Sequence, residues 1–236
     1  MTNKILIFLL IVVIFFAGND LLKGEVGILD HKGENIYYRI SPFGRAEYND
    51  LGVVDYKGIK LNLVTFKTKV LLLEDTETIY SDPQTLLPYR IERNISQLFG
   101  KEYITEEFDQ KNFQVVITKY KGKKLVNTQV IKAAGPIQNV ILLPFSLRNS
   151  PGLEIGWKFT ARVPAEFKLE LVSIDEIKVP AGKFQAYHFK SNPDKFEIWI
   201  KKDEPRVPLK IKGKGGLNYA VLMKKYNLPG NLAGKP

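Results

Sequence analysis

The sequence predicts an all-β protein built on a large, curved antiparallel sheet that is half-barrel or barrel-like. From about residue 24 onward, nearly every segment alternates apolar and polar residues with a period of two. Gly, Pro, Asn or Asp interrupts these segments at short intervals, as expected for strands joined by tight turns. Helical periodicity is scarce. We therefore expect roughly nine to twelve strands, with a β-sandwich as the alternative architecture.

The N-terminus has one positive charge followed by an uncharged apolar run, which is typical of a secretory signal. At about 1.5 Å per helical residue this run spans roughly 22 Å, less than the roughly 30 Å hydrocarbon core of a bilayer. We predict that residues 1–18 form a signal peptide. An N-terminal anchor is the alternative, because Ala17 and Gly18 suit a cleavage site whereas Phe15 and Phe16 do not. The protein should be exported, and periplasmic or membrane-associated on the outer side of the cytoplasmic membrane.

The composition bounds the class of protein. The chain contains no cysteine, which excludes a disulfide framework and thiol chemistry, so stability must come from a packed core. Residues 24–228 suit a single all-β domain, and residues 229–236 read as a flexible C-terminal tail. The formal net charge of +10 indicates an anionic partner, such as a lipid surface or an anionic envelope polymer. The alternative interpretation is that scattered lysines maintain solubility.

The expected strands follow one another with short turns between them. Strands are expected over residues 34–40, 59–73, 113–120, 167–179, 184–190, 195–201, 207–213 and 217–226. The segment 59–73 is long enough for one bent strand, and the last five strands should form a continuous meander. Asp82 and Pro83 open a type I turn, after which Pro88 belongs at an edge or a bulge of the next strand.

One stretch breaks the alternation. Residues 133–152 are apolar without a period of two, which indicates a short helical or irregular segment covering one opening of the sheet. Pro144 would interrupt any longer helix in this segment.

The stretch "VPAGKFQAYHFK" (179–190) raises the question of whether His188 is catalytic. Its proline and glycine are typical of a tight turn that connects two strands. His188 then falls on the same strand face as Phe184 and Ala186. Because His31 is the only other histidine, we interpret His188 as a structural residue.

Other chemistry finds little support in the sequence. No ligand cluster with metal-site spacing and no nucleophile elbow is present, so we predict no metal, no cofactor and no catalytic residues. Glu107 and Asp109 share a strand face, which a glycosidase-like pair would need, and a cell-wall glycan hydrolase is therefore the remote alternative. The glycine-rich stretch 213–216 is interpreted as a turn, because no helix follows it.

Lysines are the more informative feature. On an extended segment 207–213 the apolar residues face one side and the lysines face the other. Neighbouring strands would add further lysines, which predicts a patch that attracts an anionic surface, made of Lys201, Lys202, Lys210, Lys212, Lys214, Lys224 and Lys225. Nucleic acid is excluded as a partner because the protein is expected to be exported.

Four segments carry a resemblance to a known family. They are "GENIYYRISPFGRAEY" (33–48), "YSDPQTLLPYRIER" (80–93) with a later "EEFD", "VPAGKFQAYHF" (179–189) and "IWIKKDEPRVPLKIKG" (198–213). In this order they resemble the exported bacterial family catalogued as domain of unknown function 3108, over roughly Gly33 to Tyr226. The resemblance agrees with export and with an all-β fold, and it supplies no catalytic residues.

These observations support three hypotheses for the function. The first is a non-enzymatic cell-envelope protein that binds a lipid or other amphipathic ligand in the curved sheet. The second is a structural or adaptor module that binds another envelope protein. The third is the glycan hydrolase. The sequence does not identify ligand-binding residues.

Overall fold

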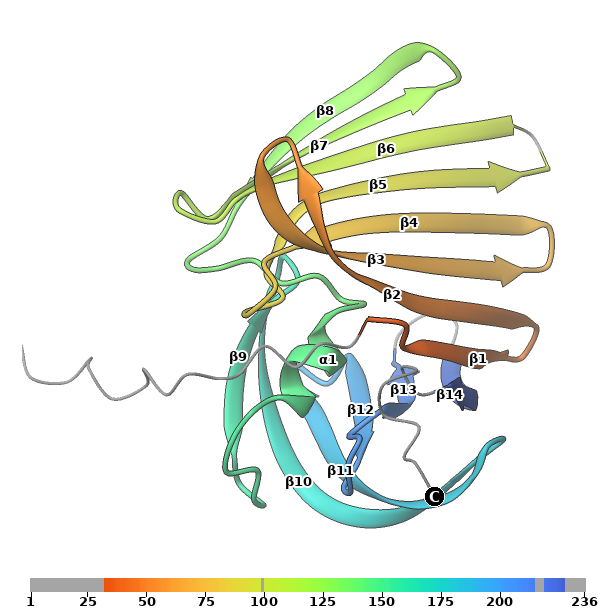
Figure 1. Ribbon diagram of the computed structural model, residues 1–236, viewed down its shortest axis with the longest axis vertical. Coiled ribbons are helices and arrows are strands. Elements are labelled where there is room, and N and C mark those ends of the chain that lie inside the picture. Colours follow the sequence, from red (N-terminus) through yellow and green to blue (C-terminus); the bar gives the residue numbers. More distant parts are fainter. Residues whose placement is uncertain (1–31, 99, 215–218, 228–236) are drawn as a thin grey trace, which may run out of the picture.

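The computed structural model describes residues 32–98, 100–214 and 219–227. Within them, fourteen antiparallel strands form one curved, unclosed sheet, and one short helix, α1, lies against its concave side (Figure 1). The predicted leader (1–18) and tail (229–236) lie outside the described residues.

Each strand is hydrogen-bonded to the next strand in the chain, except that β8 and β9 form the two edges of the sheet and β1 pairs with β14. The order across the sheet is β8-β7-β6-β5-β4-β3-β2-β1-β14-β13-β12-β11-β10-β9. The elements are β1 (Asn35–Ser41), β2 (Gly44–Tyr56), β3 (Ile59–Val70), β4 (Leu73–Ser81), β5 (Pro88–Gln97), β6 (Gly100–Asp109), β7 (Gln114–Lys121), β8 (Lys124–Lys132), α1 (Leu143–Arg148), β9 (Lys158–Arg162), β10 (Glu166–Val179), β11 (Gly182–Asn192), β12 (Phe196–Lys201), β13 (Pro208–Gly213) and β14 (Tyr219–Asn227).

The two halves, β1–β8 and β9–β14, are two meanders that join where β1 pairs with β14. In Figure 1, β3–β8 spread as an open wing, whereas β9–β14 curl around the other side of α1. The half-barrel prediction and the meander of the last five strands are therefore confirmed, and the β-sandwich alternative is wrong because all strands belong to one sheet.

The predicted number of strands is wrong. The segment 59–73 is not one bent strand: it contains β3, a two-residue turn and the start of β4. Leu71 adopts a positive φ of 53°, a conformation that the sequence does not signal because leucine seldom takes it. The opposite occurs in β2, where residues 49–52 have the composition of a turn but form a bulge within one continuous strand. In this bulge the Asp50 side chain accepts the backbone N–H of Gly52 at 2.8 Å.

Helix α1 joins two hydrophobic clusters. Leu142 and Phe145 pack into a cluster that contains side chains of β1–β5 and of β10–β14, whereas Leu143 and Leu147 pack into the cluster formed with β9–β12. Phe145 also stacks on Tyr48 of β2, with ring centroids 4.0 Å apart. The short helix therefore fills the concave side that the sequence assigned to residues 133–152.

The local sequence explains where α1 begins. The Asn139 side chain accepts the backbone N–H groups of Ile141 (2.8 Å) and Leu142 (3.1 Å), and Pro144 lies in the first turn. A proline is tolerated in the first turn because its missing N–H would have no partner inside the helix. Pro144 therefore lies at the start of a short helix, and no longer helix runs through it.

A buried ion pair fixes the other end of α1. The Arg148 guanidinium donates two hydrogen bonds to the Glu34 carboxylate, at 2.7 and 2.8 Å. The Arg148 and Glu34 side chains are only 3% and 0% exposed. Because Glu34 directly precedes β1, this pair ties α1 to the centre of the sheet.

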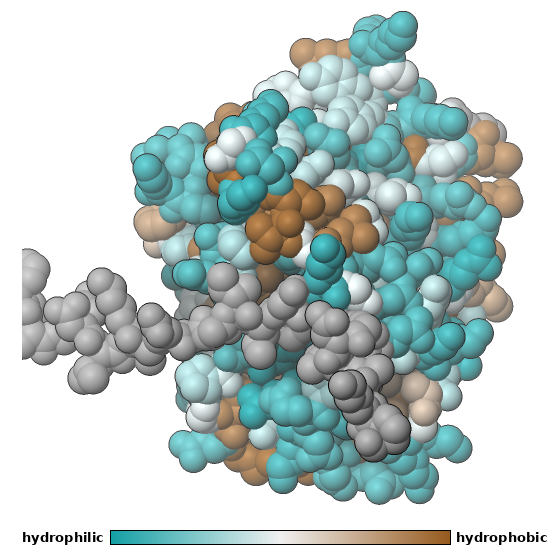
Figure 2. Space-filling view, viewed as in Figure 1, coloured by the Kyte–Doolittle hydropathy of each residue, from teal (hydrophilic) through white to brown (hydrophobic). Residues whose placement is uncertain are grey.

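Most of the surface seen in Figure 2 is hydrophilic, with separate apolar groups among the polar ones. Within the described part of the chain, no helix has the length and hydrophobicity needed to span a membrane.

The buried pair generates a stability prediction. Glu34→Ala should lower the free energy of unfolding by about 3 to 5 kcal/mol, because it leaves the Arg148 charge buried without a partner. The double variant Glu34→Leu with Arg148→Met should be more stable than Glu34→Ala, since it removes both charges and retains apolar volume. Urea unfolding of the three proteins measures this. A loss below about 1 kcal/mol for Glu34→Ala would contradict it.

Candidate ligand pocket

An apolar pocket lies beside α1, between the two halves of the sheet. Its volume is about 360 Å³, within the range of about 300 to 1,000 Å³ typical of small-molecule sites. Most of the lining side chains are aliphatic or aromatic. The lining residues are Tyr38, Ile40, Phe66, Thr68, Glu77, Val140, Ile141, Leu143, Pro144, Phe145, Lys195, Phe196, Ile198, Pro208, Ile211, Gly213, Lys214, Tyr219 and Val221.

One wall of the pocket follows from the register of four adjacent strands. Ile198 of β12 pairs with Ile211 of β13, and Ile211 pairs with Val221 of β14. Val221 in turn pairs with Ile40 of β1. Residues paired across strands point to the same face, so these four side chains form a continuous apolar row.

The residues that line the pocket include one carboxylate. Glu77 of β4 is only 15% exposed and lies 3.5 Å from the Arg93 guanidinium, which also binds Asp75. Burial raises the pKa of Glu77 to about 7; Arg93 opposes the shift, and Asp75 and Glu106 reinforce it. Sequence reasoning missed Glu77, although its spacing from Ile79 places a carboxylate on the apolar face of the strand.

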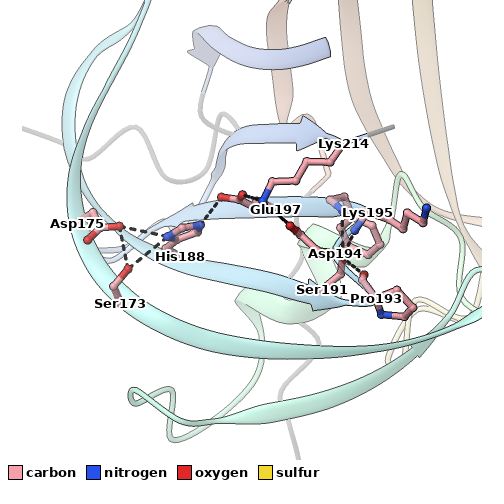
Figure 3. Close-up of polar contacts among 10 residues, drawn as sticks. Ser173, Asp175, His188, Ser191, Pro193, Asp194, Lys195, Glu197 and Lys214 are labelled. Atoms are coloured by element: carbon pink, nitrogen blue, oxygen red, sulfur yellow. Dashed lines mark hydrogen bonds and ion pairs between the residues drawn. The ribbon is translucent and has the colours of Figure 1, made fainter. Parts of the chain in front are cut away.

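His188 belongs to a different set of polar contacts, which crosses β10–β13 (Figure 3). Its Nε2 lies 2.7 Å from Oε2 of Glu197, and its Nδ1 lies 3.2 Å from Oδ2 of Asp175. Lys214 continues the chain of contacts by binding Glu197 and, at 2.9 Å, Asp194. Burial opposes the ionisation of Glu197, but hydrogen bonds from Lys214 and His188 outweigh it and lower its pKa.

This geometry is that of a packed structural histidine. The His188 ring stacks on Trp199, with centroids 4.2 Å apart, and the Lys210 ammonium lies 4.2 Å from the centroid of the same indole. The Ser173 hydroxyl donates to Asp175 at 2.8 Å and lies 3.3 Å from His188, so its proton is directed to the carboxylate. Neither Ser173 nor His188 lines the apolar pocket.

The structure separates the lysines of the predicted anionic-surface patch. Lys224 and Lys225 lie in an outer groove of about 520 Å³ with Arg45, Lys67 and Lys69, which the sequence analysis did not include; Glu47 and Glu74 also line this groove. The other members of the patch lie elsewhere. Lys201 donates to the Glu204 carbonyl at 3.2 Å, and Lys202 is exposed. Lys210 lies over the Trp199 ring, Lys212 is opposite Glu197 in the β12–β13 register, and Lys214 binds Asp194 and Glu197. The attraction of this patch to an anionic surface stays a prediction.

The two carboxylates considered for glycan hydrolysis have separate structural roles. Glu107 forms an ion pair with Arg90, and its side chain is 64% exposed. Asp109 accepts the backbone N–H groups of Lys111 and Asn112 at the β6–β7 turn, and hydrogen bonds from Asn112 lower its pKa. Among the described residues, no group of three or more His, Asp or Glu is arranged to hold a metal ion.

Glu77 makes the stability depend on pH. The native protein holds this proton more tightly than the unfolded chain, so the Glu77 contribution to stability falls as pH rises from 4.5 to about 7. Glu77→Gln should therefore raise the free energy of unfolding by about 1 to 3 kcal/mol at pH 8 and change it little at pH 4. Urea unfolding at both pH values tests this. An equal effect at the two values would exclude Glu77 as the titrating group.

A second prediction concerns His188. Glutamine cannot stack on Trp199 or reach both flanking carboxylates, so His188→Gln should lower the free energy of unfolding by about 1 to 3 kcal/mol. Ligand binding to the folded protein should stay unchanged. A variant that is as stable as the parent but has lost its function would show that His188 acts at a functional site.

The comparisons with known proteins are informative about family and fold. A search of curated proteins finds no match. A crystal structure described as a beta-barrel-like protein of domain of unknown function DUF1849 from Brucella abortus is similar, with a TM-score of 0.50 and 11% identity. The similarity covers 83% of this chain and 97% of that one, and it supports the fold alone. The family described as protein of unknown function DUF3108 matches residues 47–219, and the chain therefore belongs to the DUF3108 family.

Proposed function

We propose that this protein binds an amphipathic ligand, such as a lipid, in the pocket beside α1 and does not transform it. The observation that carries the proposal is the apolar row of Ile198, Ile211, Val221 and Ile40, which forms one wall of a 360 Å³ pocket. Apolar side chains around such a volume favour a ligand with a hydrocarbon part, because its transfer from water is favourable.

Polar groups at the pocket suit the other end of such a ligand. Lys195 is exposed, lines the pocket and forms no ion pair with another described residue. Its ammonium suits an anionic headgroup, whereas the more buried Glu77 suits a hydroxyl or an amine. The proposed ligand therefore combines an apolar chain with a polar head.

The location of the protein is part of the proposal. The apolar, uncharged N-terminal run supports export, and we propose that the protein acts in the cell envelope, in the periplasm or on the outer side of the cytoplasmic membrane. Lipids and anionic polymers are the abundant amphipathic and charged components of that compartment.

A second candidate function rests on the edge strand β8. Leu125, Val126 and Val130 of this strand are 53%, 53% and 54% exposed. An exposed apolar edge offers unpaired backbone groups to a strand of another protein. This observation favours an adaptor that binds another envelope protein through β8.

Native mass spectrometry of the protein purified from its own envelope fraction tests the first candidate. We expect a bound hydrophobic molecule that organic solvent removes. Consistent recovery of the protein without such a molecule, together with one co-purifying protein partner, would favour the adaptor instead.

A pocket-filling variant tests the site. Val221→Phe adds bulk to the apolar row and should weaken binding of the fluorescent fatty acid cis-parinaric acid about tenfold, or about 1.4 kcal/mol. Val126→Phe makes the same change on the exposed edge strand β8 and serves as the matched control. Fluorescence titration of both variants measures the effect. Equal affinities in parent, variant and control would place the ligand elsewhere.

A further inference from the structure

We propose that one end of the sheet docks on an anionic membrane surface through a row of four hairpin tips. The tip row consists of residues 42–45 (β1–β2), 69–74 (β3–β4), 97–98 with 100–101 (β5–β6) and 121–124 (β7–β8). It combines exposed apolar side chains with basic ones, and it differs in both respects from the opposite end of the sheet.

The topology places the four tips together. In an antiparallel meander, alternate turns fall at the same end of the sheet, about 10 Å apart. Gly44 pairs with Val70, Glu74 pairs with Ser96, and the Gly122 N–H donates to the Lys101 carbonyl, so each tip adjoins the next. Figure 1 shows these turns along one side of the wing.

The apolar side chains of the tip row are unusually exposed. Leu71, Leu72, Phe43 and Leu98 are 71%, 69%, 67% and 67% exposed, the four highest values among large hydrophobic residues in the described part of the chain. Figure 2 shows apolar groups at the right-hand edge, where Figure 1 places the β3–β4 and β5–β6 tips. Side chains of this kind insert readily into the headgroup region of a bilayer.

The charge of the tip row complements an anionic surface. The described residues of the row include six basic side chains and one acidic side chain, Glu74, which binds Lys69. The basic residues are Arg45, Lys69, Lys101, Lys121, Lys123 and Lys124. The three tips at the opposite end, residues 55–60, 81–88 and 109–114, hold three basic and three acidic side chains. Each basic residue near an anionic leaflet adds to membrane attraction.

Turn chemistry does not account for the apolar tips. At the opposite end, Asp55, Asp82 and Asp109 each accept a backbone N–H of their own turn, which is ordinary turn stabilisation. The β3–β4 turn places Leu71 at a φ of 53°, and the three opposite turns hold Lys57, Leu86 and Phe113 at φ values of 55°, 56° and 52°, so a positive φ is common to both ends. Leu86 and Phe113 are half-buried, whereas Leu71 is 71% exposed, and a membrane contact explains this exposure of a leucine.

Part of the pocket lining lies at the same end of the sheet. Ser41, at the end of β1, pairs with Ala220 at the start of β14, and Phe196 pairs with Gly213. Pocket residues Lys195 and Tyr219 therefore lie at the end of the sheet that carries the tip row. Docking would bring these two residues toward the lipid, although the docking inference itself does not depend on a ligand in the pocket.

Co-sedimentation with vesicles tests the docking in the protein without the predicted leader (1–18), because that apolar segment would itself bind vesicles. The vesicles are phosphatidylcholine alone, or phosphatidylcholine with roughly one third phosphatidylglycerol. We expect binding to the anionic vesicles that weakens with added salt, and little binding to the neutral ones. Leu71→Ser with Leu72→Ser and Leu98→Ser should lower the partition coefficient about tenfold or more. Val53→Ser with Ile59→Ser, exposed residues nearer the opposite end, should leave it unchanged.

Two further variants separate docking from folding and from ligand binding. Leu71→Asn should raise the unfolding midpoint, because asparagine tolerates a positive φ, and should still weaken vesicle binding. Val221→Phe should bind vesicles like the parent even if it no longer binds cis-parinaric acid.

Three outcomes would overturn the docking proposal. The first is a parent protein that binds neither vesicle. The second is a triple leucine variant that binds anionic vesicles like the parent. The third is a parent that forms dimers which the triple variant does not form, since that would assign the tips to a second copy of the chain.

Discussion

The ion pair between Arg148 and Glu34 holds together parts of the chain that the hydrogen bonds of the sheet do not join. Arg148 ends α1, and Glu34 directly precedes β1 in the middle of the sheet. Both side chains are buried, so each charge depends on the other for compensation. The Arg148 guanidinium also lies over the ring of Phe145, 4.9 Å from its centroid, and Phe145 lines the pocket. An unclosed sheet needs such a fixed element, because its edge strands meet no partner across the opening.

The two halves of the sheet use polar residues differently. In β9–β14, His188 contacts Glu197 and stacks on Trp199, and Glu197 also binds Lys214, so these polar groups have partners within a packed sheet face. In β1–β8, Glu77 is held near Arg93 beside the pocket, where its ionisation is opposed by burial. A satisfied network suits a structural role, whereas a partly satisfied carboxylate in an apolar pocket is available to a ligand.

The two ends of the sheet also differ in chemistry. One end has aspartate-stabilised turns with balanced charge, and the other has apolar and basic tips and also carries the pocket residues Lys195 and Tyr219. The similarity to a DUF1849 structure supports the fold, and neither it nor membership of the DUF3108 family assigns a function to either end. The proposed ligand and membrane contacts therefore rest on the arrangement of this chain's own residues.

The sequence by itself determined the all-β class, the meander of the last strands, the turn after Val179 and the short helical segment, because these follow from local periodicity and turn residues. Tertiary structure decided the rest. The φ of Leu71 converts one expected strand into two, and long-range pairing gathers Ile40, Ile211 and Val221 into one wall. Lys214 illustrates the same limit: its charge is evident in the sequence, but its two carboxylate partners come from folding. Local pattern specifies which face a side chain occupies, whereas its neighbours depend on strand order and register, which only the complete sheet defines.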